Sequence, residues 1–452
     1  MNTSKLAYIE TFGCQMNERD SEIMGQILTR ADYRPTNDVK QADLVLINTC
    51  SIRDKAEQKV YSLLGRLKKL KERKPSLIIT VAGCVAQQEG KKLPKRMPQV
   101  DIVLGTQNIY HLPELISRKV ESGEPQIAID LLPSFEIPAY TPHSPAADHC
   151  KHTGHLEFRK FVTIMQGCNN FCTYCVVPYT RGREVSRPVQ DILAEIKDLA
   201  DQGITEITLL GQNVNSYGQS LKNGDEKSAF PALLHAVAEI EGIKRLRFTT
   251  SHPKDFSEEL MQCFTGIAKL CPHFHLPVQS GSNRILKKMN RKYTIETYLA
   301  KVEALQKICP GIAITTDIIV GFPGETDEDF EATMQLLEKM RFRGAYSFKY
   351  SDRPLAKSTS FDDKVPEGVK SARLARLQAR QDEINLAHNR EYIGSCVEVM
   401  VEGRSKNTDG QWSGRTTTNN IVHFPASDLK PGQLVTVKIL EGLVHSLRGE
   451  MV

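Results

Sequence analysis

Hydrophobic positions in the first part of the chain alternate between two periods. Short β-rich runs are separated by helical patterns. The β-rich runs are KLAYIETFG, ADLVLINT, LIITVAG and VDIVLGT. The helical segments are ERDSEIMGQILTRA, RDKAEQKVYSLLGRLKKLKE and residues near 88–97. Alternating βα units of this kind predict a parallel sheet with helices on its faces. We therefore expect an amino-terminal α/β domain over residues 1–132.

A change of composition marks the end of this pattern. Residues 133–155 contain four prolines and no hydrophobic period, which predicts a linker. Six strand patterns then alternate with helices from FVTIM to AYSFKYS, which indicates a partial (βα)6 barrel over residues 156–386 and a charged helix from about Ala375 to Asn389. Short alternating strands with glycine turns over 387–452 predict a small all-β barrel.

The composition narrows the class of protein. With 40% hydrophobic and 25% charged residues, the 452-residue chain fits a globular protein of several domains. It shows neither a signal-peptide pattern nor a run of about 18 apolar residues, so we expect a cytoplasmic protein without a membrane span. In that reducing compartment the eleven cysteines favour thiolate ligands or nucleophiles over disulfides. The net charge of +5 permits a nucleic-acid partner without requiring one.

Cys168, Cys172 and Cys175 form a C-x3-C-x2-C loop after a predicted strand. Three thiolates can hold three irons of a [4Fe-4S] cluster, because iron-sulfur clusters select thiolate ligands. The fourth iron then stays open, as a catalytic metal requires. The alternatives are structural cysteines and a zinc site, although zinc needs a fourth ligand that the loop lacks.

Cys14, Cys50 and Cys84 each close a predicted strand, 36 and 34 residues apart. Such spacing matches one βα unit each, and the carboxyl ends of parallel strands meet at one edge of a sheet. Neighbouring strands lie about 4.8 Å apart, so the three loops can converge on one cofactor. A second cluster with an open iron follows as a hypothesis. The alternative is that these cysteines are small buried hydrophobic residues.

The C-x3-C-x2-C loop, with Tyr174 just before its last cysteine, resembles the radical S-adenosylmethionine (SAM) superfamily. The resemblance implies that SAM chelates the open iron and is cleaved to a 5'-deoxyadenosyl radical. Polar residues at the carboxyl ends of the following strands fit that cofactor, although each alone is typical of a strand-end turn. These candidates are Gln212, Asn213, Ser251, His252, Gln279, Ser280 and Asp317.

Together with the second triplet, the motifs resemble the methylthiotransferases along the whole chain. TFGCQMNERDSE, NTCSIRDKAEQK, GCNNFCTYCVVPYTRGREVSR and LLGQNVNSYG are similar to the tRNA 2-methylthio-N6-isopentenyladenosine synthases, the MiaB type. This implies two [4Fe-4S] clusters, two uses of SAM, methylthiolation of C2 of an adenosine beside the tRNA anticodon, and an RNA-binding TRAM barrel. A low-potential electron donor such as flavodoxin or ferredoxin and a monomeric enzyme are further expectations.

Three alternatives stay open at this point. The substrate could be threonylcarbamoyl-adenosine in tRNA or a ribosomal protein, the chain could be a non-catalytic iron-sulfur RNA-binding protein, or it could hold one cluster only. One segment also departs from the family pattern. YSDRPLAKS lacks the glycine and threonine of the usual YSxRxGT, with Leu355 and Ala356 in their places.

RNA binding requires positive side chains for the phosphates. The best-placed candidates follow the cysteine loop or lie in the tail: Arg181, Arg183, Arg187, Arg404, Lys406 and Arg415. Weaker candidates are Lys244, Arg245, Arg247, Lys287, Lys288, Arg291 and Lys292. Residues 390–452 contain seven basic and seven acidic residues, so any affinity of the barrel must depend on local placement.

Overall fold

The computed structural model describes residues 4–51, 54–132, 135–140, 158–221, 230–405 and 410–452. It divides into two compact units. One comprises Met1–His155, Met165–Asn169 and Val176–Arg187, and the other comprises Leu156–Ile164, Asn170–Cys175 and Pro188–Val452. Most of the predicted linker lies outside the described residues, so its limits stay a prediction. Among the described helices, none combines the length and the apolar character needed to cross a membrane.

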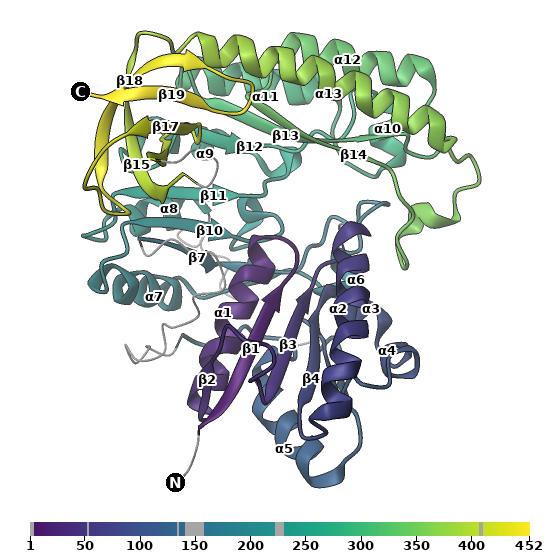
Figure 1. Ribbon diagram of the computed structural model, residues 1–452. Helices are drawn as coiled ribbons and strands as arrows, with labels where there is room; N and C mark the ends of the chain where they lie inside the picture. Colours follow the sequence, from purple (N-terminus) through teal and green to yellow (C-terminus); the bar gives the residue numbers. More distant parts are fainter. Residues whose placement is uncertain (1–3, 52–53, 133–134, 141–157, 222–229, 406–409) are drawn as a thin grey trace. The chain divides into compact units, whose positions relative to one another are not determined.

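The first unit contains a six-stranded sheet in the order β2-β1-β3-β4-β5-β6 (Figure 1). All its pairs are parallel, which confirms the predicted α/β class. The strands are β1 (Lys5–Thr11), β2 (Tyr33–Pro35), β3 (Leu44–Thr49), β4 (Ile78–Gly83), β5 (Ile102–Leu104) and β6 (Gln126–Ala128). β3 and β4 are buried along their whole length, because helices cover both faces.

The helices of this unit follow the predicted order. They are α1 (Gln15–Arg30), α2 (Asp54–Arg73), α3 (Cys84–Glu89), α4 (Lys92–Arg96) and α5 (Leu112–Ser122). The single helix predicted near 88–97 is wrong, since α3 and α4 are separate. Gly90 stands between them with φ +49°, a backbone conformation that favours glycine and interrupts the helix.

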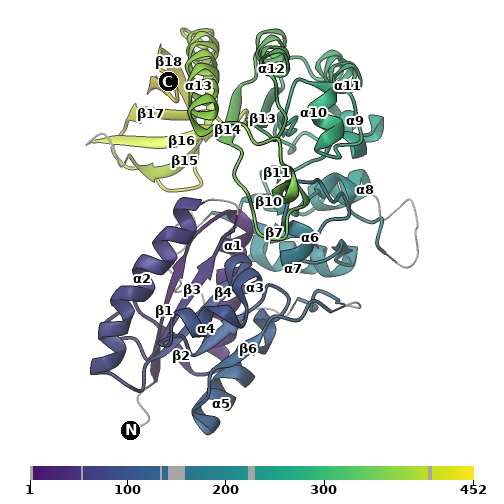
Figure 2. The same cartoon turned by 90° about the vertical axis from the view of Figure 1, so that its right-hand side faces the viewer.

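Six parallel strands of the second unit form two three-stranded sheets, β11-β10-β7 and β12-β13-β14 (Figures 1 and 2). The strands are β7 (Arg159–Thr163), β10 (Glu206–Leu210), β11 (Arg245–Thr249), β12 (His273–His275), β13 (Ala313–Val320) and β14 (Gly344–Lys349). The predicted six strands are thus present, but among the described residues the pairing between the two sheets is limited to an isolated bridge from Leu246 of β11 to Leu270, just before β12. Pro272 and Pro277 flank β12, and a proline cannot donate to a β-ladder, which keeps this strand short.

Helices cover the outer faces of these sheets. They are α7 (Val189–Asp201), α8 (Phe230–Ala238), α9 (Glu258–Gly266), α10 (Asn283–Lys288), α11 (Ile295–Ile308), α12 (Asp327–Met340) and α13 (Glu367–Arg390). α13 begins earlier than predicted. Two short strands, β8 (Met165–Gln166) and β9 (Val185–Ser186), and α6 (Val177–Thr180) belong to the first unit.

The tail forms the predicted small barrel, closed in the order β15-β16-β17-β19-β18. Its strands are β15 (Cys396–Arg404), β16 (Gln411–Thr416), β17 (Ile421–Pro425), β18 (Leu434–Gly442) and β19 (Leu447–Met451). Alternate residues point inward and build an apolar core around Phe424 and Ile439. The chain therefore combines a parallel α/β sheet, a six-stranded parallel α/β domain and a five-stranded barrel.

Candidate metal centres and cofactor site

Three neighbouring strands carry Cys14, Cys50 and Cys84 to one edge of the first sheet. β1, β3 and β4 are adjacent and parallel; Cys14 precedes α1, Cys50 follows β3, and Cys84 begins α3. A hydrogen bond with Cys50 lowers the pKa of the Cys14 thiol to about 6, although burial opposes the shift. The structure thus places the three cysteines at one edge of the sheet, as the βα spacing predicts, with the thiols of Cys14 and Cys50 in contact.

Gly13 and Gly83, which directly precede Cys14 and Cys84, set the backbone conformation at these two cysteines. Gly13 and Gly83 have φ of +138° and +90°. A Cβ atom on Gly13 would lie 2.4 Å from the Cβ of Cys50, and one on Gly83 would lie 2.3 Å from Oδ1 of Asn48. Only glycine allows both the backbone conformation and this close approach.

Two buried asparagines join the loops that bear these cysteines. Asn17 donates hydrogen bonds to Oδ1 of Asn48 at 3.0 Å and to the Thr49 carbonyl at 2.7 Å, and Asn48 donates to the Asn17 carbonyl at 2.8 Å. The Cys14 thiol lies 3.4 Å from Oδ1 of Asn17. The sequence analysis missed both asparagines, although each lies within three residues of a cysteine.

Arg181 lies buried in the same unit and is ion-paired, so it is not available to an RNA phosphate. Its Nη2 lies 2.6 Å from Asp20, while its buried Nη1 has no hydrogen-bond partner among the described residues. Burial raises the pKa of Cys84, and the charge of Arg181 opposes that rise and favours the thiolates of Cys84 and Cys14. The unsatisfied Nη1 donor needs a hydrogen-bond acceptor besides Asp20, and the sulfur atoms of a thiolate-ligated cluster would fit that role.

The second triplet lies on the loop that follows β8. The backbone N–H of Cys168 donates to the Gly182 carbonyl at 3.2 Å within the first unit. Cys172 and Cys175 belong to the second unit, where the Cys175 N–H donates to the Cys172 carbonyl at 2.9 Å. Thr173 between them donates its N–H to the Met289 carbonyl and its hydroxyl to the Lys288 carbonyl, both at 3.0 Å. The loop is therefore anchored at the end of α10.

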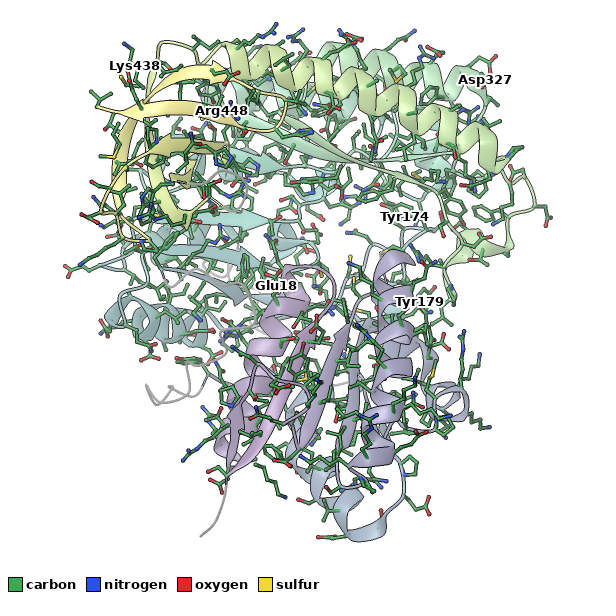
Figure 3. All side chains as sticks on the ribbon, in the orientation of Figure 1. Glu18, Tyr174, Tyr179, Asp327, Lys438 and Arg448 are labelled. Carbon is green, nitrogen blue, oxygen red and sulfur yellow. The ribbon has the colours of Figure 1, made fainter. Side chains whose placement is uncertain are left out.

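Arg291 is the buried cation of this second set. Its Nη1 lies 3.4 Å from the sulfur of Cys172 and 3.3 Å from the hydroxyl of Tyr174, and its Nη2 donates to the Pro277 carbonyl at 2.7 Å. Tyr174, labelled in Figure 3, has its pKa raised by burial. Arg291, a weaker RNA candidate from the sequence, is instead 4% exposed and supports the cysteine loop.

No three His, Cys, Asp or Glu side chains in the described parts of the chain converge closely enough to hold one metal ion. A [4Fe-4S] cluster does not require such convergence, because each thiolate binds a different iron. The two triplets are therefore compatible with clusters, and both have a buried arginine that suits an anionic group.

Polar residues at the carboxyl ends of β10 and β11 leave buried atoms unsatisfied. Oδ1 of Asn213, Oγ of Ser251 and Nε2 of His252 have no hydrogen-bond partner among the described residues. Burial, reinforced by the charges of Arg291 and two lysines, lowers the pKa of His252 to about 2, so its ring is neutral. Buried polar atoms without partners are rare in native proteins, and they suit a polar ligand such as SAM.

The other predicted cofactor residues lie on or just after three strands, β10, β12 and β13. Gln212 follows β10; Gln279 and Ser280 follow β12 and are buried. Gln279 has φ +72° and its N–H donates to the Asp317 carbonyl at 2.8 Å. Asp317 lies within β13 rather than at its end, with its Oδ1 3.6 Å from Nε2 of His275.

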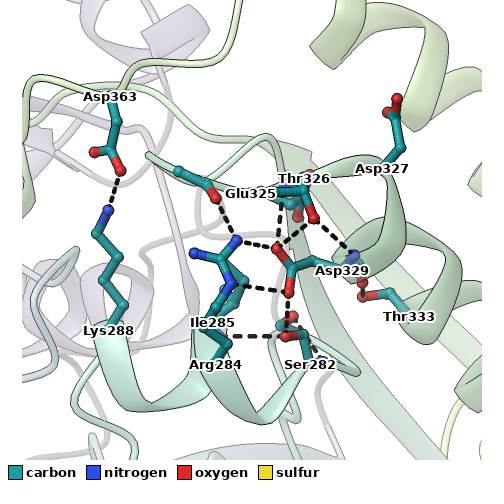
Figure 4. Close-up of polar contacts among 12 residues, drawn as sticks. Ser282, Arg284, Ile285, Lys288, Glu325, Thr326, Asp327, Asp329, Thr333 and Asp363 are labelled. Carbon is teal, nitrogen blue, oxygen red and sulfur yellow. Dashed lines mark hydrogen bonds and ion pairs between the residues drawn. The ribbon is translucent and has the colours of Figure 1, made fainter.

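A network around Asp329 joins the loops after β12 and β13 (Figure 4). Asp329 accepts from the Ser282 hydroxyl at 2.5 Å and from Arg284, and it caps α12 through Thr326. Ser282 is the N-cap of α10, the helix whose end anchors the cysteine loop. The network therefore connects the rim of the candidate cofactor site to Cys172 and Cys175.

The remaining predicted RNA contacts differ in exposure. Arg183 is exposed, and Arg187 is buried. Arg404 is exposed and lies over the Trp412 ring at 4.8 Å, Arg415 is ion-paired with Glu402 at 2.9 Å, and Lys406 lies outside the described residues.

Arg245 and Arg247 connect the small barrel to β11. Arg245 pairs with Glu398 at 2.8 Å, and Arg247 donates to the carbonyls of Thr416 and Thr417 at 2.8 and 3.0 Å. Both arginines are nearly inaccessible and act within the second unit, so they are not surface contacts for RNA.

Three family models match successive parts of the chain. They are the uncharacterized protein family UPF0004 over residues 6–105, the radical SAM superfamily over 162–337 and the TRAM domain over 390–452. The fold is similar to that of the radical S-adenosylmethionine methyltransferase TsrM from Kitasatospora setae, with a TM-score of 0.55 at 14% identity, covering 79% of this chain and 75% of that one. Fold and site together define a radical SAM enzyme with a cysteine-bearing amino-terminal domain and a TRAM barrel.

Two relatives identify the branch of this superfamily. The tRNA-2-methylthio-N(6)-dimethylallyladenosine synthases of Desulfotalea psychrophila and Syntrophobacter fumaroxidans are 57% and 50% identical to this chain. Each match covers 98% of this chain, and 98% and 95% of the two relatives. The chain belongs to this family of tRNA methylthiotransferases.

Proposed function

We propose that this enzyme adds a methylthio group to C2 of N6-dimethylallyladenosine (isopentenyladenosine) beside the tRNA anticodon. The observation that carries the proposal is the full-length match to two synthases of this name. The position of Cys14, Cys50 and Cys84 at one edge of the first sheet supports it further, because a methylthiotransferase needs a sulfur-bearing centre besides the radical SAM loop. We place the reaction in the cytoplasm, with a monomeric enzyme and a flavodoxin or ferredoxin as electron donor.

Each cysteine triplet would hold one [4Fe-4S] cluster with one iron free of protein ligands. When bound, the clusters and SAM supply a 5'-deoxyadenosyl radical that removes hydrogen from C2 and a methylated sulfur that replaces it. The chain contributes position and charge. Arg181 and Arg291 offset the negative charge of the thiolates, and both are too deeply buried to pair with bulk anions.

The SAM site would lie at the carboxyl ends of β10 to β13. The spare polar atoms of Asn213, Ser251 and His252 would accept or donate hydrogen bonds to SAM, and the neutral His252 ring adds no charge that would repel a sulfonium. Gln212, Gln279 and Ser280 complete this rim. The sheet, its helices and the rim loops would exclude water from the reacting atoms once SAM is bound.

RNA contacts outside the site would come from exposed arginines. Arg183 and Arg404 are accessible to phosphates, and Lys406 stays a candidate by its position in the sequence. Arg187 and Arg415 are held within the protein, and we assign them a supporting role.

The substrate is tested with reconstituted enzyme and two anticodon stem-loops, one bearing dimethylallyladenosine and one bearing threonylcarbamoyl-adenosine. We expect methylthiolation of the first only, detected by mass spectrometry of the nucleosides. Modification of the second alone would overturn the proposed substrate. Absence of 5'-deoxyadenosine with SAM and a strong reductant would overturn the enzymatic function altogether.

A further inference from the structure

The strand β14 carries two large aromatic side chains that are exposed among the described residues. Tyr346 and Phe348 are 58% and 41% exposed. β14 is the edge strand of its sheet (Figures 1 and 2), and its register aligns Tyr346 with Asp317 and Phe348 with Ile319. Side chains at paired positions of parallel strands share a face, so these four form one surface, which we call the β14 face.

The β14 face is the side of the sheet opposite to the helices. Ile318 and Val320, on the other side of β13, are completely buried. Lys349, whose side chain alternates with that of Phe348, donates to the Ser371 hydroxyl of α13 at 3.3 Å. Tyr346 and Phe348 therefore point away from α13 and toward the interior of the open barrel.

This face is continuous with the cysteine loop and contains polar groups. The His275 ring meets the Tyr346 ring edge to face, with centroids 5.9 Å apart, and its Nε2 lies 3.6 Å from Oδ1 of Asp317. Ile319 packs in the same hydrophobic cluster as Tyr174, the residue before Cys175. The aromatic side chains of the β14 face thus lie beside the polar side chains of His275 and Asp317. At Ile319 the face adjoins the hydrophobic cluster that includes Tyr174 of the cysteine loop.

Residues of the small barrel contact β11 at the other end of the parallel strands, since Arg245 donates to the Arg415 carbonyl at 2.8 Å. Burial lowers the pKa of His273 to about 3, and the positive charges of Arg247 and Arg415 add to the effect, which places both cations near this ring. Arg247 also holds the carbonyls of Thr416 and Thr417. Because the small barrel occupies this end, the carboxyl ends of the strands are the side from which a ligand would reach the β14 face.

We propose that the β14 face binds the modified nucleoside itself: the adenine stacks on Tyr346 and the dimethylallyl group packs on Phe348 and Ile319. The inference rests on the proposed function. A base in a single-stranded loop is usually splayed out and stacked on aromatic side chains. The dimethylallyl group is an apolar branch that gains from leaving water. Asp317 and His275 lie beside Tyr346, where they can reach the polar edge of the base.

The test uses anaerobically reconstituted full-length enzyme and stem-loops with dimethylallyladenosine or plain adenosine at the same position. Tyr346→Ala removes the stacking ring and is expected to raise KM for the modified stem-loop about tenfold, whereas Tyr346→Phe keeps the wild-type value. Phe348→Ala is expected to reduce the preference for modified over plain stem-loop, measured as a ratio of Kd values, by about fivefold. Ser347→Ala, on the helix side of the same strand, is the matched control.

Cleavage of SAM in the absence of RNA reports the clusters and the fold separately, and all four variants should keep it. Unchanged KM and Kd ratios in both alanine variants would overturn the inference. A rate loss seen only with a protein electron donor, and not with dithionite, would assign the face to that donor and also overturn it. If the wild type binds the modified stem-loop through Tyr346 but does not methylthiolate it, the proposed function fails and the binding face stands.

Discussion

The two cysteine triplets are built in opposite ways. Cys14, Cys50 and Cys84 come from three βα units and are held by a continuous parallel sheet, whereas Cys168, Cys172 and Cys175 come from one loop of eight residues. A sheet fixes its loop starts through many backbone hydrogen bonds. A loop has no such frame, so its position depends on contacts from outside.

Those outside contacts come from the segment after α10 and from the loop after β14. Asn290 donates to the Phe171 carbonyl at 3.0 Å, and the Ser358 N–H donates to the Thr173 carbonyl at 2.9 Å. Both sets also use one buried arginine against their sulfur atoms, Arg181 in one and Arg291 in the other. We call Cys14, Cys50 and Cys84 the dispersed set, and Cys168, Cys172 and Cys175 the local set. The dispersed set should tolerate changes in remote loops that weaken the local set.

The largest effect is expected for the triple variant Cys14→Ala, Cys50→Ala, Cys84→Ala, which tests the two cysteine sets separately. We expect it to lose half of about eight irons per chain, because each set binds one four-iron cluster. It should still cleave SAM but make no methylthio product, as measured by iron analysis and chromatography of 5'-deoxyadenosine. The matched triple variant at Cys168, Cys172 and Cys175 should lose SAM cleavage as well. Unchanged iron in the first variant would contradict the second cluster.

Arg181→Met should produce the next largest effect, on the dispersed set. Removing one partner of a buried ion pair costs about 3–5 kcal/mol, because Asp20 is left charged and unpaired. We expect a lower Tm of the apoprotein and less iron after reconstitution, and adding Asp20→Asn should recover part of the Tm. Arg376→Met is the control, since its pair with Glu331 is exposed to solvent and contributes little to stability. Equal Tm losses in the two arginine variants would contradict a special role for Arg181.

A smaller effect than that of Arg181→Met is expected for Asp329→Asn, which should weaken the hydrogen-bond network behind Cys168, Cys172 and Cys175. Burial alone would raise the pKa of Asp329 above its usual 3.8. Hydrogen bonds from Arg284 and Ser282 oppose this effect and lower the pKa to about 2. A depressed folded-state pKa stabilises the fold above the usual pKa, and this stabilisation is lost as the pH falls toward 2.

The free energy of unfolding of Asp329→Asn should therefore be lower by about 1–3 kcal/mol at pH 7. The gap to the wild type should narrow below pH 4, as followed by denaturant unfolding of the apoprotein over a pH series. Glu331→Gln, at an exposed ion pair on the same helix, is the control with little change. A gap that is constant with pH would show that the charge of Asp329 is not responsible.

The sequence predicted the features that depend on local pattern and failed where distant segments meet. The parallel sheet, the six strands and the small barrel follow from hydrophobic period, and the shared edge of Cys14, Cys50 and Cys84 follows from βα spacing. The roles of Arg181 and Arg291 could not be predicted. The sequence around an arginine does not distinguish one that binds an RNA phosphate from one that lies buried beside a thiol. The isolated bridge from Leu246 of β11 to Leu270, just before β12, could not be predicted either, because it joins segments that no local pattern brings together.

The smallest expected effect concerns Leu355, which occupies the glycine position of the YSxRxGT pattern. Leu355 has φ +72° and is 56% exposed, so the loop keeps a glycine-like conformation with a side chain that disfavours it. A left-handed conformation costs a non-glycine residue about 1–2 kcal/mol, and the greater freedom of unfolded glycine offsets part of that. Leu355→Gly should therefore stabilise the apoprotein by about 1 kcal/mol. Leu355→Ala, which keeps the strain, should change Tm little; an equal gain in both variants would assign the effect to the exposed side chain. Since Ser358 of this loop holds Thr173, Leu355→Gly should also slow iron loss from the local set without affecting the dispersed one.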